Sequence, residues 1–169
     1  MPKAERIAVL INPVDATNAN ATVRAIEPAA RAIGLKLRIL SASTSREIDA
    51  AFATIERDRS NAVFIGQTPF LAARRVQLAH LATRYMIPAA YAGREFPEVG
   101  GLMSYGPDIA DAYRQVGIYT GRLLKGAKVA DLPVVQANKF ELVINAQTAR
   151  LLGLNLPTQL LARADEVIE

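Results

Sequence analysis

The sequence predicts an α/β fold with three layers, in which helices flank a mostly parallel sheet. Apolar, β-rich segments alternate with helical segments, and the unit of strand, polar loop, helix and next strand recurs about every 26–28 residues, long enough for parallel crossovers. Trp is absent and aromatic residues make up 6% of the 169 residues. A core of Ala, Val, Ile and Leu packed between helices and sheet is therefore expected.

The composition is that of an ordinary globular domain, with 51% hydrophobic and 21% charged residues. The net charge is +4, but the basic residues are spread along the predicted helices, and the densest pair is Arg74 and Arg75. No nucleic-acid partner is expected from such a distribution. The absence of Cys excludes disulfides, thiol catalysis and Cys-ligated metal sites.

In the N-terminal part, residues 7–11 form an apolar run typical of a strand buried on both faces, and Pro13 follows it. Thr17, Asn18 and Asn20 are candidate N-caps for a helix that runs to about Ile33 and is closed by Gly34. Further strands are predicted at residues 35–40, 62–65 and 88–92, the first of them alternating like an edge strand; helices are predicted after residues 43–45 and after residues 66–69.

The C-terminal third is less regular. A short strand is predicted at residues 102–104, and Pro107 begins a long helix over residues 109–124 that Gly126 ends. This helix has a broad apolar stripe and linkers on both sides, so it is the element expected to leave the main body. Residues 140–144 predict a strand, and residues 146–151 predict a short helix stopped by Gly153.

Polar loops are predicted at the carboxyl ends of the strands, over residues 12–20, 41–45, 66–70 and 91–96. Ligands of open α/β sheets bind at this edge. Ser, Thr and Asn are also common helix caps. Helix capping, without any ligand, therefore explains any one of these loop residues taken alone. Arg94 is suited to a ligand carboxylate or, equally, to a surface ion pair that closes its turn.

No catalytic, metal or dinucleotide site is predicted. His80 lies between Ala79 and Leu81 in a predicted helix, where a packed or surface histidine is expected rather than a base. Residues 103–106 lack the first Gly of a nucleophile elbow, and the loop after the first strand matches neither phosphate-binding glycine pattern. We therefore expect no enzyme activity and no cofactor.

Several segments resemble one known family, the ABC transporter substrate-binding proteins that include tryptophan- and tyrosine-type members. The likeness spans nearly the whole chain and is most specific in its C-terminal part. The matching segments are residues 94–96, 99–108, 123–128, 131–134 and 139–145. Residues 7–13 and 42–49 resemble the family more loosely, in their kinds of residue.

The resemblance implies a type I periplasmic-binding-protein-like fold, with two α/β lobes that close on a ligand. This chain is similar to the second lobe alone. Residues 1–106 then form the main part of that lobe, residues 107–130 a crossover helix that packs on a first lobe or a partner chain, and residues 131–169 the return strand and C-terminal segment. An exposed crossover helix would favour self-association, so a homodimer is expected.

By the same resemblance, the ligand is a small organic solute such as an amino acid or aromatic carboxylate, bound by cleft closure, and the further partner is an ABC permease. The expected ligand-binding residues, assigned by loop position, are Asn12, Thr17, Gln67, Thr68, Tyr91 and Arg94. Tyr91 would stack on the ligand, and Arg94 would pair with its carboxylate.

Two other functions stay open at this point. The first is a cytoplasmic small-molecule sensor or interaction domain that reuses the fold. The second is an enzyme of the flavodoxin-like or sugar-phosphate type, for which the sequence offers no plausible base. The family resemblance implies the periplasm. The first residues show no apolar signal segment, which implies the cytoplasm if this is the whole gene product.

Overall fold

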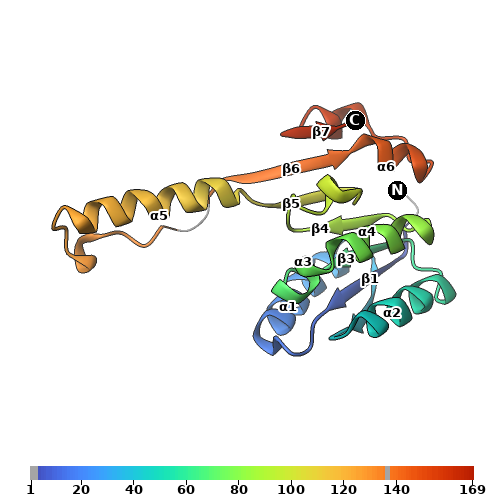
Figure 1. Ribbon diagram of the computed structural model, residues 1–169. Coiled ribbons are helices and arrows are strands. Elements are labelled where there is room, and N and C mark those ends of the chain that lie inside the picture. Colours follow the sequence, from blue (N-terminus) through green and yellow to red (C-terminus); the bar gives the residue numbers. More distant parts are fainter. Residues whose placement is uncertain (1–3, 136–137) are drawn as a thin grey trace.

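The computed structural model describes residues 4–135 and 138–169. Its seven strands form one sheet in the order β2-β1-β3-β4-β5-β6-β7. Four of the five pairs among β1 to β6 are parallel, β6 runs antiparallel to β5, and β7 runs parallel to β6. The predicted α/β class with a mostly parallel sheet is confirmed (Figure 1).

The strands lie close to the predicted positions. They are β1 (Arg6–Ile11), β2 (Lys36–Ser41), β3 (Ala62–Ile65), β4 (Ala89–Tyr91), β5 (Met103–Pro107), β6 (Phe140–Asn145) and β7 (Glu166–Ile168). Ala8, Val9 and Leu10 are fully buried, as expected for a strand covered on both faces, and β2 lies at the sheet edge, as its alternation indicates. The strand β7 was not predicted.

The helices are α1 (Ala16–Ala32), α2 (Ser45–Arg57), α3 (Pro69–Ala73), α4 (Arg75–Arg84), α5 (Ile109–Leu124), α6 (Ala146–Leu151) and α7 (Thr158–Leu161), with short 3-10 turns η1 (Pro97–Val99) and η2 (Val129–Asp131). Two helix predictions need correction. The N-cap of α1 is Asp15, which accepts a hydrogen bond from the backbone of Asn18. The single helix expected after residues 66–69 is broken at Arg74 into α3 and α4.

The main core lies between one face of the sheet and the helices α2, α3 and α4. Its sheet residues come from alternate positions of neighbouring strands, among them Leu10, Val63, Ile65 and Tyr91. From the helices, Phe52, Ile55, Leu71 and Leu78 pack against them. This layer fixes the carboxyl ends of β1, β3 and β4, where the polar loops begin.

The helix α5 extends away from the sheet, and the chain returns beside it to β6 (Figure 1). None of the 16 described residues of α5 is buried. The division of the chain into lobe, crossover helix and return segment at residues 106 and 130 stays a prediction. In the described part of the chain, no helix combines the length and apolarity that crossing a bilayer requires.

Candidate functional site

The first polar loop joins β1 to α1 and is held by its own side chains. Asn12 is buried, and its Oδ1 accepts a hydrogen bond of 3.0 Å from the backbone of Val14. Asp15 Oδ1 accepts one of 3.1 Å from the backbone of Asn18. Thr17 is left exposed on the first turn of α1. Asn12 therefore shapes the loop, and Thr17 is exposed to solvent.

The second polar loop follows β3 and lies against the end of β1. The backbone N–H of Gly66 donates to the carbonyl of Leu10 at 2.9 Å, and a Cβ on Gly66 would lie 3.2 Å from that oxygen. This close approach places Gln67, which is exposed, at the same sheet edge as Asn12. Thr68 is buried and caps α3, because its Oγ1 accepts from the backbone of Leu71 at 3.2 Å.

The loop before α2 is a helix cap. Thr44 and Glu47 form a capping box, and Glu47 Oε2 also accepts hydrogen bonds from the backbone and hydroxyl of Ser43. These hydrogen bonds, led by the one from the Ser43 backbone, lower the pKa of Glu47. Ser43, Thr44 and Glu47 form hydrogen bonds with one another. Helix capping therefore explains why these polar residues occur in the loop.

Tyr91 lies in the core and not on the ligand-facing edge. It is 1% exposed, and its ring stacks on Phe96 with the centroids 4.3 Å apart. Among the described residues its hydroxyl has no hydrogen-bond partner, and burial raises its pKa. The expected stacking of Tyr91 on a ligand is thus not what the structure favours.

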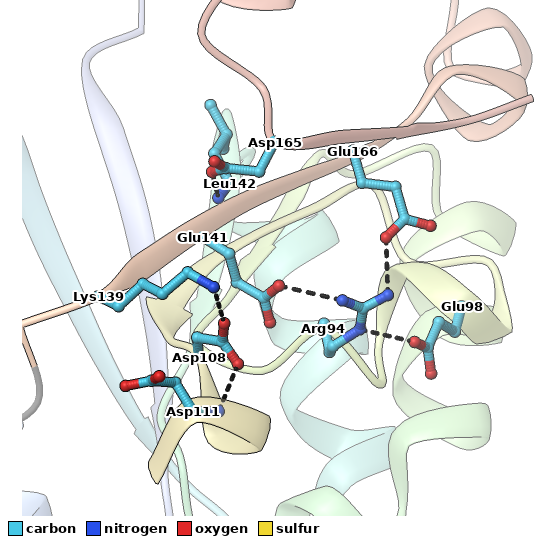
Figure 2. A network of polar contacts seen from close by, with 9 residues as sticks. All are labelled: Arg94, Glu98, Asp108, Asp111, Lys139, Glu141, Leu142, Asp165 and Glu166. Atoms are coloured by element: carbon cyan, nitrogen blue, oxygen red, sulfur yellow. Dashed lines mark hydrogen bonds and ion pairs between the residues drawn. The ribbon is translucent and has the colours of Figure 1, made fainter. Parts of the chain in front are cut away.

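Arg94 is the centre of an ion-pair network (Figure 2). Its Nε, Nη1 and Nη2 donate to Glu98, Glu141 and Glu166 at 2.9, 3.0 and 2.7 Å. These hydrogen bonds, with that of Glu98 the largest influence, raise the pKa of Arg94. A ligand carboxylate would have to displace one of three carboxylates here. Of the two roles considered for Arg94, the structure favours the ion pair, in which Arg94 connects the loop after β4 to η1, β6 and β7.

A second ion pair holds the base of α5. Lys139 Nζ lies 2.6 Å from Asp108 Oδ2, and Asp108 Oδ1 caps the helix by accepting from the backbone of Asp111 (Figure 2). The hydrogen bond from Lys139 is the main cause that lowers the pKa of Asp108, and the same bond raises the pKa of Lys139. Both chain segments of the projecting arm are tied together at this point.

We expect the carboxyl of Asp108 to titrate below the usual value of about 3.9 for Asp. Because its pKa is lowered in the folded state, the stabilisation is present above that usual value and is lost as the pH falls through the folded pKa. Carboxyl-detected NMR titration measures the midpoint. Lys139→Met should move it upward, whereas Lys128→Met, an exposed lysine further along the arm, should leave it unchanged. An unmoved midpoint in Lys139→Met would contradict this assignment.

Asn12, Thr17, Gln67 and Thr68 lie in the segments that follow the neighbouring strands β1 and β3. Tyr91 is instead buried in the core, and Arg94 is paired with three glutamates. Asp15, the N-cap of α1, is a polar residue of this edge that was missed; an Asp directly before a helix was its signal. Within the described ranges, no three His, Asp or Glu side chains are grouped closely enough to hold a metal ion. The exposed hydrogen-bonding groups at this edge are the hydroxyl of Thr17 and the amide of Gln67.

Comparison with known proteins supports this description. A family model described as ABC transporter substrate binding protein matches residues 1–168. A search of curated protein sequences finds no match.

Solved structures share the fold over 99% of this chain. A conserved domain protein from Vibrio cholerae has 27% identity and a TM-score of 0.87, with 56% of its chain covered. An ABC domain in complex with L-Trp from Streptococcus pneumonia has 25% identity and a TM-score of 0.87, with 58% covered. A substrate binding protein from Clostridium difficile, ligand-free and open, has 22% identity and a TM-score of 0.73, with 55% covered, and shows the fold alone. This chain thus spans little more than half the length of these structures.

Proposed function

The chain belongs to the ABC transporter substrate-binding protein family, and we propose that it is a solute-binding component of an ABC-type importer, without catalysis. Members of this family bind solutes rather than transform them. The proposed solute is a small organic molecule, such as an amino acid or an aromatic carboxylate. The single observation that supports it most is the likeness to the L-Trp complex over 99% of this chain.

The proposed contact surface is the sheet edge at the ends of β1 and β3. Thr17 and Gln67 are exposed there and offer a hydroxyl and an amide, while Asn12 and Thr68 are buried and hold the two loops in shape. Backbone N–H groups of the loops add donors for a polar ligand group. Tyr91 and Arg94 are left out of this proposal because their groups are buried or already paired.

A closed binding cleft needs a second wall. Since this chain spans 58% of the length of the L-Trp-bound structure, we propose that it supplies one wall. The proposed partners are the solute, an ABC permease and a second copy of this chain in a homodimer, and the proposed compartment is the periplasm. Static light scattering at tens of micromolar should give the mass of a dimer; a monomer would contradict the homodimer and leave solute binding standing.

A thermal-shift screen with L-Trp, other amino acids and aromatic acids tests solute binding. A ligand that binds only the folded state raises the melting temperature by mass action, by an amount equivalent to about 2.7 kcal/mol at a hundred times Kd. We expect L-Trp or a related solute to raise the melting temperature, and calorimetry to give its Kd.

Gln67→Ala should weaken that binding several-fold by removing an exposed amide at the proposed edge. Gln147→Ala is the matched control, because Gln147 is exposed on α6, which begins at the opposite end of the sheet. Equal binding by Gln67→Ala and the unmodified chain would place the solute elsewhere. No shift with any solute of these classes would contradict the function itself.

A further inference from the structure

A charged hollow lies at the amino ends of β1, β2 and β3, the end of the sheet opposite to the loops that follow β1 and β3. It has a volume of about 680 Å³, and its charged lining residues are Glu5, Arg6, Lys36, Arg57, Asp58 and Arg59. An adjoining hollow shares three of these residues and adds a further charged residue, Arg38. The two together are named the amino-end hollow.

The amino-end hollow carries most of the net positive charge of the chain. Its lining holds five basic and two acidic side chains, a surplus of three, whereas the whole chain has a surplus of four. All five basic residues are exposed, and they come from three separate segments of the chain, so the sequence alone shows no cluster. Like charges that are held together repel one another, and an anion among them removes that repulsion.

The acidic residue Asp58 balances only part of this charge. Its Oδ2 lies 3.1 Å from Arg38 Nε, and its Oδ1 lies 3.9 Å from Arg57 Nε. Its backbone carbonyl accepts a hydrogen bond from Arg6 Nη1. Among the described residues, no carboxylate lies within ion-pair distance of the Lys36 ammonium or the Arg59 guanidinium. Lys36 and Arg59 are therefore the cations whose charge the described part of the chain leaves unbalanced.

Backbone contacts fix the three segments of the hollow relative to one another. Asn61, directly before β3, accepts hydrogen bonds through its Oδ1 from the backbone N–H groups of Glu5 and Arg6 at 2.9 and 3.0 Å. The backbone N–H of Lys36 donates to the carbonyl of Glu5 at 2.8 Å. The turn before β3 and the starts of β1 and β2 thus hold their basic side chains around one space.

Arg59 has a backbone conformation that favours glycine. Its φ is +52°, and it directly follows the C-cap of α2. The same position after α1, α5 and α6 is occupied by Gly34, Gly126 and Gly153, each with a positive φ. A side chain in this region destabilises the folded chain relative to Gly. An arginine in this strained position supports a role for its side chain. The other such residue among those described, Met86 after α4, lies outside the hollow and serves as a control below.

We propose that the amino-end hollow binds a small soluble anion of the phosphate class, with Lys36 and Arg59 as its main contacts. A phosphate group presents several charged acceptor oxygens, which match the donors of an ammonium and a guanidinium group. Charges at this density are costly to bury against an apolar surface, so a further protein layer is a poor alternative occupant. The proposal is independent of solute binding, because the solute is proposed to bind at the opposite ends of these strands.

Inorganic pyrophosphate is the probe for this site, with sodium chloride at the same ionic strength as the reference. Millimolar pyrophosphate should raise the melting temperature of the unmodified chain above the reference, because it binds the folded state. Lys36→Gln should weaken pyrophosphate binding at least tenfold in calorimetry and remove most of this shift. Arg24→Gln is the matched control: Arg24 is exposed on α1, outside the hollow, so this variant loses the same charge and should keep the shift.

Arg59→Gly gives a second test, in which stability and binding change in opposite directions. Without pyrophosphate, the variant should melt about 2–4 °C higher than the unmodified chain, because Gly relieves the strain and one repelling charge is removed. With pyrophosphate, most of the shift should be lost. Met86→Gly is the control for the backbone, because Met86 has a similar φ of +54°. It should relieve strain too, but it should keep the full pyrophosphate shift.

Three results would overturn the proposal. The first is a pyrophosphate shift no larger than the sodium chloride reference, and the second is an equal shift in the unmodified chain, Lys36→Gln and Arg59→Gly. The third is binding to vesicles of phosphatidylcholine and phosphatidic acid without any pyrophosphate shift, since the phosphate group would then be recognised only at a lipid surface. An L-Trp shift measured on the same samples reports separately on solute binding, and Arg59→Gly should leave it unchanged.

Discussion

Gly106→Ala should destabilise the protein by about 3 kcal/mol or more, a large part of the 5–15 kcal/mol that stabilises a typical domain. Gly106 lies on β5 beside the point where the chain leaves β4. A Cβ at this position would overlap the carbonyl oxygen of Ala92 and lie 2.9 Å from its carbonyl carbon. Both atoms belong to the backbone, so no side-chain rotation can relieve the overlap, and β4 and β5 would have to separate.

Urea denaturation, followed by circular dichroism, measures this loss as a lower midpoint. Gly34→Ala separates the overlap from backbone strain, because Gly34 has a φ of +72° but free space around its Cβ position. Gly34→Ala should lower the free energy of unfolding by about 1 kcal/mol. If Gly106→Ala lowered the urea midpoint no more than Gly34→Ala does, the close approach of Gly106 to the carbonyl of Ala92 would be contradicted.

The order of strands and helices could be read from the sequence because each signal was local. The apolar run of β1, the alternation of β2 and the Gly after α1 all act within a few residues of chain. The two features that the sequence did not predict, the break at Arg74 and the strand β7, also involve short segments. Nothing in the pattern near Arg74 marks the break between α3 and α4, because Arg74 is neither Gly nor Pro, and β7 has only three residues and two of them are exposed.

The environment of the candidate site could be predicted less well. Arg94 is paired with Glu141 and Glu166, which lie 47 and 72 positions further along the chain, so the sequence near Arg94 gave no sign of them. Tyr91 lies at the end of a strand, where a ligand contact was expected. Period-two alternation places it on the face of Ala89, but which face meets α2 and α4 depends on tertiary packing.

Removal of the Tyr91 ring is the second substitution for which we expect a large loss of stability. Tyr91 is among the largest fully buried side chains, and Tyr91→Ala should lower the free energy of unfolding by about 3–5 kcal/mol through lost burial and a cavity. Tyr91→Phe should raise the free energy of unfolding or leave it unchanged. It keeps the ring and its stacking on Phe96 but removes a buried hydroxyl that has no partner among the described residues, a group whose burial costs about 1–3 kcal/mol.

The pH dependence of these variants gives an independent test. Burial raises the pKa of Tyr91 in the folded state, so its neutral form stabilises the fold below the usual value of about 10, and that stability is lost as the pH rises toward the folded pKa. Each pH unit in this window should cost up to about 1.4 kcal/mol in the unmodified chain. Tyr91→Phe removes this loss, so its urea midpoint should fall less between pH 9 and 11. Parallel curves for the two proteins would mean that the hydroxyl of Tyr91 reaches water or a partner after all.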